Sequence, residues 1–588
     1  MLFKRTHMCG ELREADIGQN IVLNGWIAKR RNLGSLIFCD VRDKTGITQV
    51  VFNDKIPGEI FDRADTLRSE YVVGVKGKVF ERESKNKDLP TGDIEVFAED
   101  LVIYSKSETP PIYIRDDDNA DDNLRLKYRY LDLRKKKMQE NLLFRAKVTN
   151  IARDYFAGTG FTEVETPMLI KSTPEGARDY LVPSRVNPKH FYALPQSPQT
   201  FKQLLMVGGT DRYFQIVKCF RDEDLRADRQ PEFTQIDLEM SFVDIDDVIE
   251  VQEGFLKRVM KETKGVDIET PFPRITFKEA MERYGSDKPD ARFGFRLQDI
   301  TDNVRGCEFK VFTDAIEAGG SVRAICVDGG AEVYTRKKID KLTELVKSYG
   351  ARGMVWMKVS DEGVTSSVNK FFSHEQLADI ASRLGAASGD LILVISDINK
   401  VVYDSLGFLR RHIAGEMGLL DDNVYNFLWV VDFPLFEYDE MEDRWTAMHH
   451  PFTSPKDEHV QLLKSNPHAC LANAYDIVLN GVELGGGSIR IHDRGMQEDM
   501  FKALDMGEEE IKEKFGFLVD AFQYGVPPHG GLAYGLDRLI MLLTGEKSIR
   551  EVIAFPKNQN AQCMVSGAPG VVDEMQLNEL QIQFKKEE

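Results

Sequence analysis

The chain has 588 residues, with 96 acidic and 77 basic side chains and a formal net charge of −19. This length exceeds that of one typical domain, so several folding units with separate cores are expected. Hydrophobic residues make up 42% of the chain, which excludes a disordered protein, and no apolar run approaches the roughly 18 residues of a membrane span. The acidic excess also argues against a protein that coats nucleic acid nonspecifically.

The seven cysteines are far apart, and the sequence has no CxxC pair and no histidine at ligand spacing from them. This pattern predicts reduced thiols and neither a disulfide framework nor a zinc site. Lys4 and Arg5 lie near the amino terminus, and no apolar stretch of the length found in a signal peptide follows them. A cytoplasmic location without membrane association is therefore expected.

The first hundred residues predict a small β-barrel. A helix-like stretch, Glu59–Ser69, separates the third and fourth of five strand-like runs, which is the order of an OB-type barrel. Another small β domain fits the strand count equally well. The five runs are Ile21–Ala28, Leu36–Val41, Thr48–Phe52, Tyr71–Phe80 and Ile94–Tyr104.

Residues 1–105 carry 16 basic and 17 acidic side chains, so almost all of the net charge lies elsewhere in the chain. The basic cluster Lys29-Arg30-Arg31 follows the first run, Phe38 lies on the second, and Gln49 lies on the third. OB folds use such a face to stack unpaired bases and to read their edges. Taken singly, each residue fits a solvated turn or a core position better.

Two charged segments carry features of phosphate and nucleotide binding. In the first, a strand ends at Phe220-Arg221-Asp222-Glu223 and a second strand begins at Pro231-Glu232-Phe233. Such a hairpin can hold Arg221 over a phosphate, with Phe233 stacking on a base and Glu223 accepting from its amino group. A surface hairpin with incidental ion pairs explains the same spacing.

In the second, Glu483 precedes Gly485-Gly486-Gly487, and Arg490 follows. Consecutive glycines let the backbone approach a ligand closely. Further on, a glycine-rich strand runs into an apolar helix at Gly535-Leu536-Asp537-Arg538, and a helix amino terminus with an arginine suits an anionic phosphate. Neither a P-loop nor a GxGxxG turn after a strand is present.

Together these segments resemble the class II aminoacyl-tRNA synthetases, and the OB-like barrel places the resemblance in subclass IIb. The large insertion before residue 425 is similar to that of the bacterial aspartyl-tRNA synthetases. The class motifs are Gly160–Leu169, Phe220–Glu223 and Gly535–Arg538, and the segments that look like the aspartyl type are Thr173–Tyr180, Gln196–Gln203, Ala447–Phe452 and Gly485–Arg490.

The resemblance implies a multidomain α+β chain whose catalytic domain is a mainly antiparallel sheet flanked by helices. It also implies ATP-dependent attachment of L-aspartate to tRNA(Asp) through an aspartyl-adenylate, with release of AMP and pyrophosphate. The expected organisation is an OB-fold anticodon-binding domain at 1–105, a hinge at 106–138, a first catalytic part at 139–284, an inserted α+β domain at 285–425, a second catalytic part at 426–565 and a carboxy-terminal extension at 566–588.

The resemblance also assigns roles to residues. Three are catalytic: Arg221, Arg538 and Glu483. Aspartate binding falls to Glu175, Gln199, Lys202, Arg221, Asp237, His449, His450 and Arg490. ATP binding falls to Arg221, Asp222, Glu223, Gln230, Phe233, Glu483, Gly535, Leu536, Asp537 and Arg538. Mg²⁺ is implied at Asp476 and Glu483, anticodon reading at Arg30, Phe38 and Gln49, and a homodimer with Pro167 at the interface.

Three alternatives stay open. Enzymes that also charge tRNA(Asn) often have His-Gly-Gly after the basic turn, whereas this chain has Leu33-Gly34-Ser35, which favours tRNA(Asp) alone. An ammonia-dependent asparagine synthetase shares the adenylate chemistry but lacks a nucleic-acid-binding barrel. A noncatalytic RNA-binding relative would be expected to lose Arg221, Glu483 or Arg538, and all three are present.

Overall fold

The computed structural model describes every residue except 1, 174–175, 224–228, 441 and 586–588. The chain packs into two compact units. The first takes in residues 1–147, 224–231 and 540–588, and the second takes in residues 148–223 and 232–539. Among the helices of the described residues, none is both long and apolar enough to cross a membrane.

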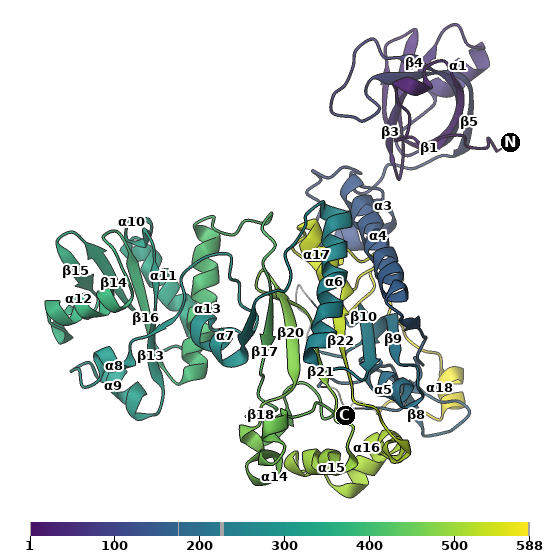
Figure 1. Ribbon diagram of the computed structural model, residues 1–588. Coiled ribbons are helices and arrows are strands. Elements are labelled where there is room, and N and C mark those ends of the chain that lie inside the picture. The colour runs from purple at the N-terminus through teal and green to yellow at the C-terminus, as the bar shows by residue number, and fades with distance from the viewer. Residues whose placement is uncertain (1, 174–175, 224–228, 441, 586–588) are drawn as a thin grey trace. The chain divides into compact units, whose positions relative to one another are not determined.

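A closed five-stranded barrel forms the amino-terminal part of the first unit (Figure 1). Its strand order is β1-β2-β3-β5-β4, and β1 closes it by pairing with both β2 and β4. Alternate side chains point inward, which buries Ile21, Leu23 and Ile27 of β1. The predicted OB-type barrel is confirmed, although its helix ends earlier than expected. The bounds are β1 (Asn20–Asn32), β2 (Leu36–Asp43), β3 (Gly46–Asn53), α1 (Gly58–Asp65), β4 (Val72–Glu81) and β5 (Ile94–Ser105).

The stretch expected as a hinge contains helices held by buried arginines. Arg129 is 2% exposed and donates to Asp132 Oδ2 at 2.7 Å and to the carbonyls of Ile553 and Ala554 at 2.9 and 3.0 Å. Because a buried guanidinium must satisfy its donors, these bonds fasten the segment to the chain around residue 553. The helices of this part are α2 (Asp122–Lys127), α3 (Arg129–Asp132), α4 (Lys136–Gly158), which continues into the second unit, and α18 (Glu574–Leu580).

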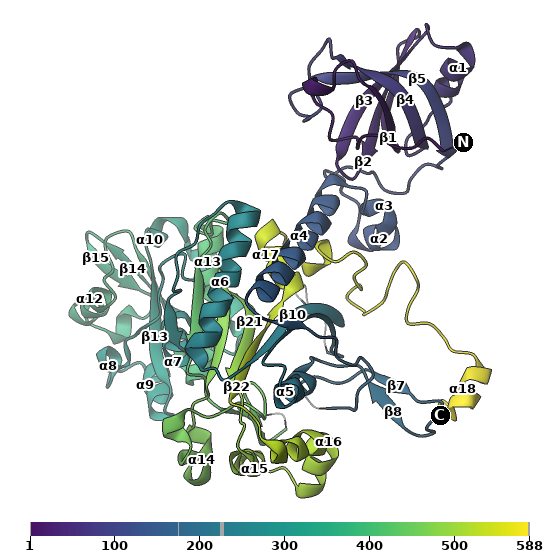
Figure 2. The same cartoon turned by 45° about the vertical axis from the view of Figure 1, so that its right-hand side comes forward.

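An eight-stranded sheet forms the centre of the second unit, in the order β11-β17-β20-β21-β22-β10-β9-β6 (Figure 2). Only the pairs β11–β17 and β6–β9 are parallel, so the expected mainly antiparallel catalytic sheet is confirmed. The bounds are β6 (Thr162–Glu163), β9 (Arg212–Phe220), β10 (Glu232–Ser241), β11 (Arg274–Thr276), β17 (Phe427–Val431), β20 (Ala474–Leu479), β21 (Val482–Ile489) and β22 (His529–Gly535).

Helices flank this sheet, as expected. Phe255 of α6 packs on Tyr534 of β22, with 5.5 Å between the ring centroids. The flanking helices are α5 (Gln199–Val207), α6 (Ile245–Lys264), α7 (Phe277–Tyr284), α14 (Leu462–Ser465), α15 (Arg494–Ala503), α16 (Glu508–Ala521) and α17 (Leu536–Thr544). Two hairpins, β7 (Leu181–Pro183) with β8 (Phe191–Ala193) and β18 (Phe436–Asp439) with β19 (Arg444–Ala447), extend from it.

A separate five-stranded sheet, in the order β12-β13-β16-β14-β15, forms the inserted α+β domain. One hydrophobic core lies around Ile325 and Leu393 and a second around Ala324 and Ile392, so alternate residues of β13 and β16 serve opposite faces of the sheet. The bounds are β12 (Gln298–Asp299), α8 (Thr301–Val304), α9 (Lys310–Glu317), β13 (Ser321–Val327), α10 (Gly330–Val333), α11 (Arg336–Lys347), β14 (Val355–Ser360), β15 (Gly363–Ser366), α12 (His374–Arg383), β16 (Leu391–Asp397) and α13 (Asn399–Glu416).

Candidate active site

Four charged side chains form a buried charge cluster: Lys202, Asp237, Glu239 and Arg490. Lys202 lies on α5, the two acids lie on the same face of β10, and Arg490 follows β21. Lys202 Nζ lies 2.6 Å from Asp237 Oδ1 and 3.3 Å from Glu239 Oε2. Arg490 donates through Nε and Nη2 to the two carboxylate oxygens of Glu239, at 2.9 and 3.2 Å. All four residues are at most 4% exposed.

The pKa values of the two acids in the buried charge cluster are shifted in opposite directions. Burial raises the pKa of Asp237, and Lys202 offsets only part of that effect. Burial also acts to raise the pKa of Glu239, but Arg490 and Lys202 together lower it to about 2. Asp237 Oδ2 is buried and has no hydrogen-bond partner among the described residues. A buried acceptor without a donor is costly, so this oxygen is a place where a ligand ammonium group fits.

Glu239 was not among the residues predicted from the sequence, although both of its carboxylate oxygens accept from Arg490. The available signal was its position two residues after Asp237, in a run where the two acids alternate with the apolar residues Ile236, Leu238 and Met240. Two acids at this spacing share one face of a strand. Both then need cations, which the structure supplies from α5 and from the end of β21.

His450 lies close enough to the buried charge cluster for its charges to act on the ring. Burial and the positive charges of Arg490 and Lys202 lower the pKa of His450 to about 3, so its imidazole is neutral at pH 7. Nδ1 accepts from the backbone N–H of Phe452 at 3.2 Å, which leaves the ring proton on Nε2. That Nε2 is buried without a partner in the part of the chain that the structure describes. It is therefore a second group available to a ligand.

Other predicted aspartate-binding residues have different positions. Glu175 lies outside the described residues. Gln199, on the first turn of α5, donates to Gln203 Oε1 at 3.0 Å. His449 Nε2 lies 3.3 Å from Asp476 Oδ1, so this histidine adjoins the predicted metal ligand. The two adjacent histidines therefore face different partners.

Arg221 and Phe233 lie together where β9 and β10 meet. The Arg221 guanidinium carbon lies 5.1 Å from the centroid of the Phe233 ring. Arg221 directly follows β9, and its buried Nε has no hydrogen-bond partner within the described ranges. A guanidinium held beside an aromatic ring suits a ligand with a phosphate and a base. Of its predicted neighbours, Asp222 donates its backbone N–H to the Arg178 carbonyl at 3.0 Å, and its Oδ2 lies 3.9 Å from Arg178 Nε.

The Gly535–Arg538 segment joins β22 to α17. Leu536 is buried, and Asp537 Oδ2 accepts from the backbone N–H of Thr234 at 2.7 Å, which ties the start of α17 to β10. Arg538 Nη1 donates to the Glu483 carbonyl at 2.8 Å. Gln230, in the first unit, exchanges two hydrogen bonds with the backbone of Lys557, at 2.7 and 3.1 Å.

The hairpin of β20 and β21 carries the predicted metal ligands Asp476 and Glu483. Burial raises the pKa of Asp476, the hydrogen bond from His449 opposes this, and the negative charges of Glu483 and Asp287 add to the rise. Gly486 lies opposite Asp476, and a Cβ there would collide with Asp476 Oδ1. A glycine is therefore needed for the carboxylate to lie across the neighbouring strand.

In the barrel, the predicted anticodon residues lie on β1, β2 and β3. Arg30 pairs with Asp65, and Phe38 is half-buried beneath the Arg31 guanidinium, which lies 5.5 Å from its centroid. Gln49 Oε1 accepts from Arg31 and Arg82 at 3.0 and 2.9 Å. Arg31 and Arg82 belong to this face, and the sequence analysis assigned neither of them a role.

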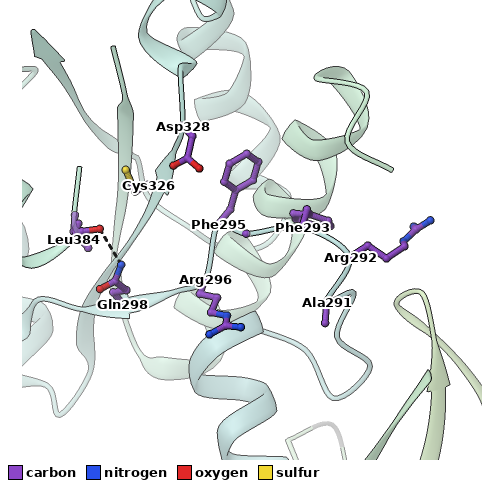
Figure 3. Close-up of a pocket in the computed structure, with 10 residues that line it drawn as sticks. Ala291, Arg292, Phe293, Phe295, Arg296, Gln298, Cys326, Asp328 and Leu384 are labelled. Atoms are coloured by element: carbon purple, nitrogen blue, oxygen red, sulfur yellow. Dashed lines mark hydrogen bonds between the residues drawn. The ribbon is translucent and has the colours of Figure 1, made fainter. Parts of the chain in front are cut away.

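A cavity of about 470 Å³ lies in the inserted domain (Figure 3). Figure 3 shows Phe293, Phe295, Asp328 and Cys326 around it. None of the predicted site residues lines this cavity. Cys326, Asp328 and Asp390 lie close together there, but Asp390 already accepts from the backbone N–H groups of Gly329 and Ala387, both at 2.8 Å.

Comparison with known families identifies the class of protein. The family described as class II tRNA synthetases (D, K and N) matches residues 121–559, and the OB-fold nucleic acid binding domain family matches residues 21–104. A crystal structure of asparaginyl-tRNA synthetase from Pyrococcus horikoshii has the same fold, with a TM-score of 0.59 at 19% identity over 94% of this chain and 98% of that one. The barrel and the antiparallel sheet are those of a class II synthetase.

Closer relatives narrow the class. The chain is 58% identical to the aspartate–tRNA ligase of Ruminiclostridium cellulolyticum, over 99% of both chains. It is 56% identical to the aspartate–tRNA(Asp/Asn) ligase of Caldanaerobacter subterraneus, over 99% of this chain and 98% of that one. The chain belongs to the aspartate–tRNA ligase family.

Proposed function

We propose that the protein attaches L-aspartate to the 3′ end of tRNA(Asp) in two steps. The α-carboxylate of aspartate attacks the α-phosphate of ATP, which gives aspartyl-adenylate and pyrophosphate. A ribose hydroxyl of the tRNA then takes the aspartyl group, and AMP leaves. The observation that carries this proposal is the buried charge cluster, in which Lys202 pairs with Asp237, Arg490 pairs with Glu239, and Asp237 Oδ2 has no hydrogen-bond partner among the described residues.

The buried charge cluster supports selection of aspartate. Lys202 and Arg490 would bind the side-chain carboxylate, with His450 Nε2–H as a third donor, and Asp237 Oδ2 and Gln199 would bind the α-ammonium group. Glu175 is proposed for the same ammonium group. Asparagine would not supply the negative charge that the aspartate side chain adds beside these two cations, and loss of that charged interaction costs about 1–3 kcal/mol or more.

The nucleotide side of the site requires no general base, because the attacking carboxylate is already ionised. Catalysis is therefore positioning and neutralisation of phosphate charge. Arg221 would bind the α-phosphate, Arg538 the γ-phosphate, and the Phe233 ring would stack on adenine. Glu223 would accept from the adenine amino group. Asp222, Gln230, Gly535, Leu536 and Asp537 complete the proposed ATP-binding set.

Asp476 and Glu483 would hold Mg²⁺. Carboxylate oxygens are the ligands that this cation prefers. Burial raises the pKa of Asp476, the negative charges of Glu483 and Asp287 add to that rise, and a bound cation would oppose both effects. Held by these two carboxylates, the ion would supply positive charge that neutralises the phosphates of ATP. His449 would keep Asp476 oriented through its hydrogen bond.

The barrel would read the anticodon, with Phe38 stacking on a base and with Arg30 and Gln49 contacting base edges. Relatives of both names, with tRNA(Asp) alone and with tRNA(Asp/Asn), are similarly close to this chain. Leu33-Gly34-Ser35 favours a restricted enzyme. Charging assays with tRNA(Asp) and tRNA(Asn) side by side decide this, and equal charging would overturn the restriction.

We also propose a homodimer that works in the cytoplasm, with Pro167 at the interface. Leu169, two residues further, is 53% exposed, which supports an apolar contact with a second copy. Sedimentation at micromolar concentration measures the oligomeric state directly, and a monomer would contradict the proposed dimer.

The reaction is tested by aspartate-dependent exchange of labelled pyrophosphate into ATP. Exchange is expected with magnesium and aspartate and not with asparagine. Arg221→Ala should abolish exchange while tRNA binding is retained, because Arg221 is assigned to ATP and aspartate and not to the tRNA. Absence of exchange in folded wild-type protein would refute the function, and unaltered exchange in Arg221→Ala would refute that residue's role.

A further inference from the structure

The inserted domain begins beside the proposed metal ligands. Lys288 Nζ lies 3.7 Å from Glu483 Oε2, and Arg538 Nη1 lies 4.0 Å from the same oxygen. Asp287 Oδ2 lies 3.8 Å from Lys288 Nζ. Two cations from distant parts of the sequence thus flank one carboxylate oxygen. One of them, Arg538, is the residue proposed for the γ-phosphate.

The segment that carries Lys288 is held rigidly from both sides. Gly285 ends α7 in the left-handed conformation (φ 65°), and a Cβ there would collide with the Tyr403 carbonyl of α13. On the other side, Asp290 packs on the β20–β21 turn so closely that a Cβ on Gly481 would lie 2.8 Å from its Cβ. The backbone around Lys288 is therefore fixed relative to the hairpin that bears Asp476 and Glu483.

Asp290 is itself anchored. It is 1% exposed and accepts from Arg292 Nε and Nη2 at 3.0 and 2.8 Å, while its carbonyl accepts from the buried Arg410 at 3.0 Å. Pro289 adds a further restriction, because a residue before proline avoids the helical region. The position of Lys288 is thus determined by several buried contacts that involve none of its own side-chain atoms.

The Lys288–Glu483 pair itself explains little of the folding stability. The side chains are 44% and 34% exposed, and ion pairs of this exposure contribute little. The same exposure leaves the ammonium group accessible to a ligand. Lysine is a compact point charge with three donors, which suits phosphate oxygens.

We propose that Lys288 is a further catalytic residue that binds the β- and γ-phosphates of ATP and the pyrophosphate that leaves. This inference rests on the proposed function, since it assumes that Arg538 and Glu483 face the same phosphates. It gives the start of the inserted domain a direct role in the first step. Lys288 acts by neutralising charge on the leaving group as the bond from the α-phosphorus to its oxygen breaks.

The test compares Lys288→Gln and Lys288→Arg with Lys347→Gln. Lys347 is a matched control, because it belongs to the same domain, is 49% exposed and pairs with Glu344. Calorimetric titration in the presence of magnesium measures affinity for ATP, pyrophosphate and AMP, and exchange kinetics give the KM for pyrophosphate. We expect Lys288→Gln to lower the affinity for ATP and for pyrophosphate roughly 10- to 100-fold, which is the effect of losing a charged hydrogen bond. The affinity for AMP should be unchanged. Lys288→Arg should recover part of the loss.

Two results would overturn the inference. One is unchanged affinity of Lys288→Gln for ATP and pyrophosphate in a protein whose wild type performs exchange. The other is an equal loss for AMP, which lacks these phosphates and would therefore report a general disturbance of the site. Absence of exchange in the wild type would instead reject the proposed function, and so the two failures are distinguishable.

Discussion

The proposed aspartate pocket and the proposed anticodon face of the barrel both contain arginines, acids and amides, but in different surroundings. In the pocket, the buried charge cluster is at most 4% exposed and its ion pairs lie in a medium from which water is excluded. On the barrel, Arg30 and its partner Asp65 have side chains that are 20% and 57% exposed. Removal of water makes an unpaired charge costly, whereas a solvated charge loses little when its partner is removed. The same residue types would therefore determine specificity in the proposed aspartate pocket and support adaptable binding on the proposed anticodon face.

The largest effect is expected from Glu239→Gln in the pocket. This change leaves Arg490 and Lys202 buried with one negative partner fewer, and breaking a buried pair costs about 3–5 kcal/mol. Thermal and denaturant unfolding of the variant and the wild type at pH 7 measure the loss. A variant as stable as the wild type would remove the distinction between the two regions.

The difference in stability between the wild type and Glu239→Gln should depend on pH. The pKa of Glu239 is lowered to about 2 from a usual 4.5, so its stabilisation is fully present above pH 4.5 and is lost as the pH falls toward 2. The stability difference between wild type and Glu239→Gln should therefore shrink over this range. A constant difference would show that the charge of Glu239 is not what stabilises the pocket.

A smaller effect is expected from Lys202→Met, which keeps an unbranched side chain of similar length and removes the charge. Loss of a charged hydrogen bond costs about 1.5–3 kcal/mol, so the KM for aspartate should rise roughly 10- to 150-fold. The KM for ATP should change little, because Lys202 contacts only the buried charge cluster. Pyrophosphate exchange measures both constants, and a parallel loss for ATP would contradict a pocket specific for the amino acid.

On the barrel, Phe38→Leu should raise the KM for tRNA, since stacking on one base contributes about 1–3 kcal/mol. Pyrophosphate exchange without tRNA should be unaffected. Aminoacylation kinetics over a range of tRNA concentrations provide the measurement. A loss of exchange would indicate that the substitution disturbs more than the anticodon face.

The smallest effect is expected from Asp65→Asn, which removes the partner of Arg30. Exposed pairs contribute about 0–1 kcal/mol, so the unfolding midpoint should be nearly unchanged. A large decrease would mean that this pair is as important to stability as the buried pairs of the pocket.

The barrel, the order of the class motifs and the aspartate–tRNA ligase family could all be predicted from the sequence, the barrel with the help of the resemblance. Strand alternation is a local property, and the pairs Phe220-Arg221 and Asp537-Arg538 are adjacent in the chain, so both are visible without a fold. The roles assigned to individual site residues stay predictions. Lys202, Asp237 and Arg490 were placed in one site by resemblance alone, because nothing local connects α5 to the end of β21.

Which charged side chains contact one another became known from the tertiary structure alone. Glu239 pairs with two cations that lie 37 and 251 residues away along the chain. Lys288 lies beside Glu483 because α7 and α13 pack together where the inserted domain begins. The energy of a charge depends on its burial and on its partners, and both are set by long-range packing. A periodic pattern in the sequence predicts that a side chain points inward, but it does not predict which side chain from another part of the chain will contact it.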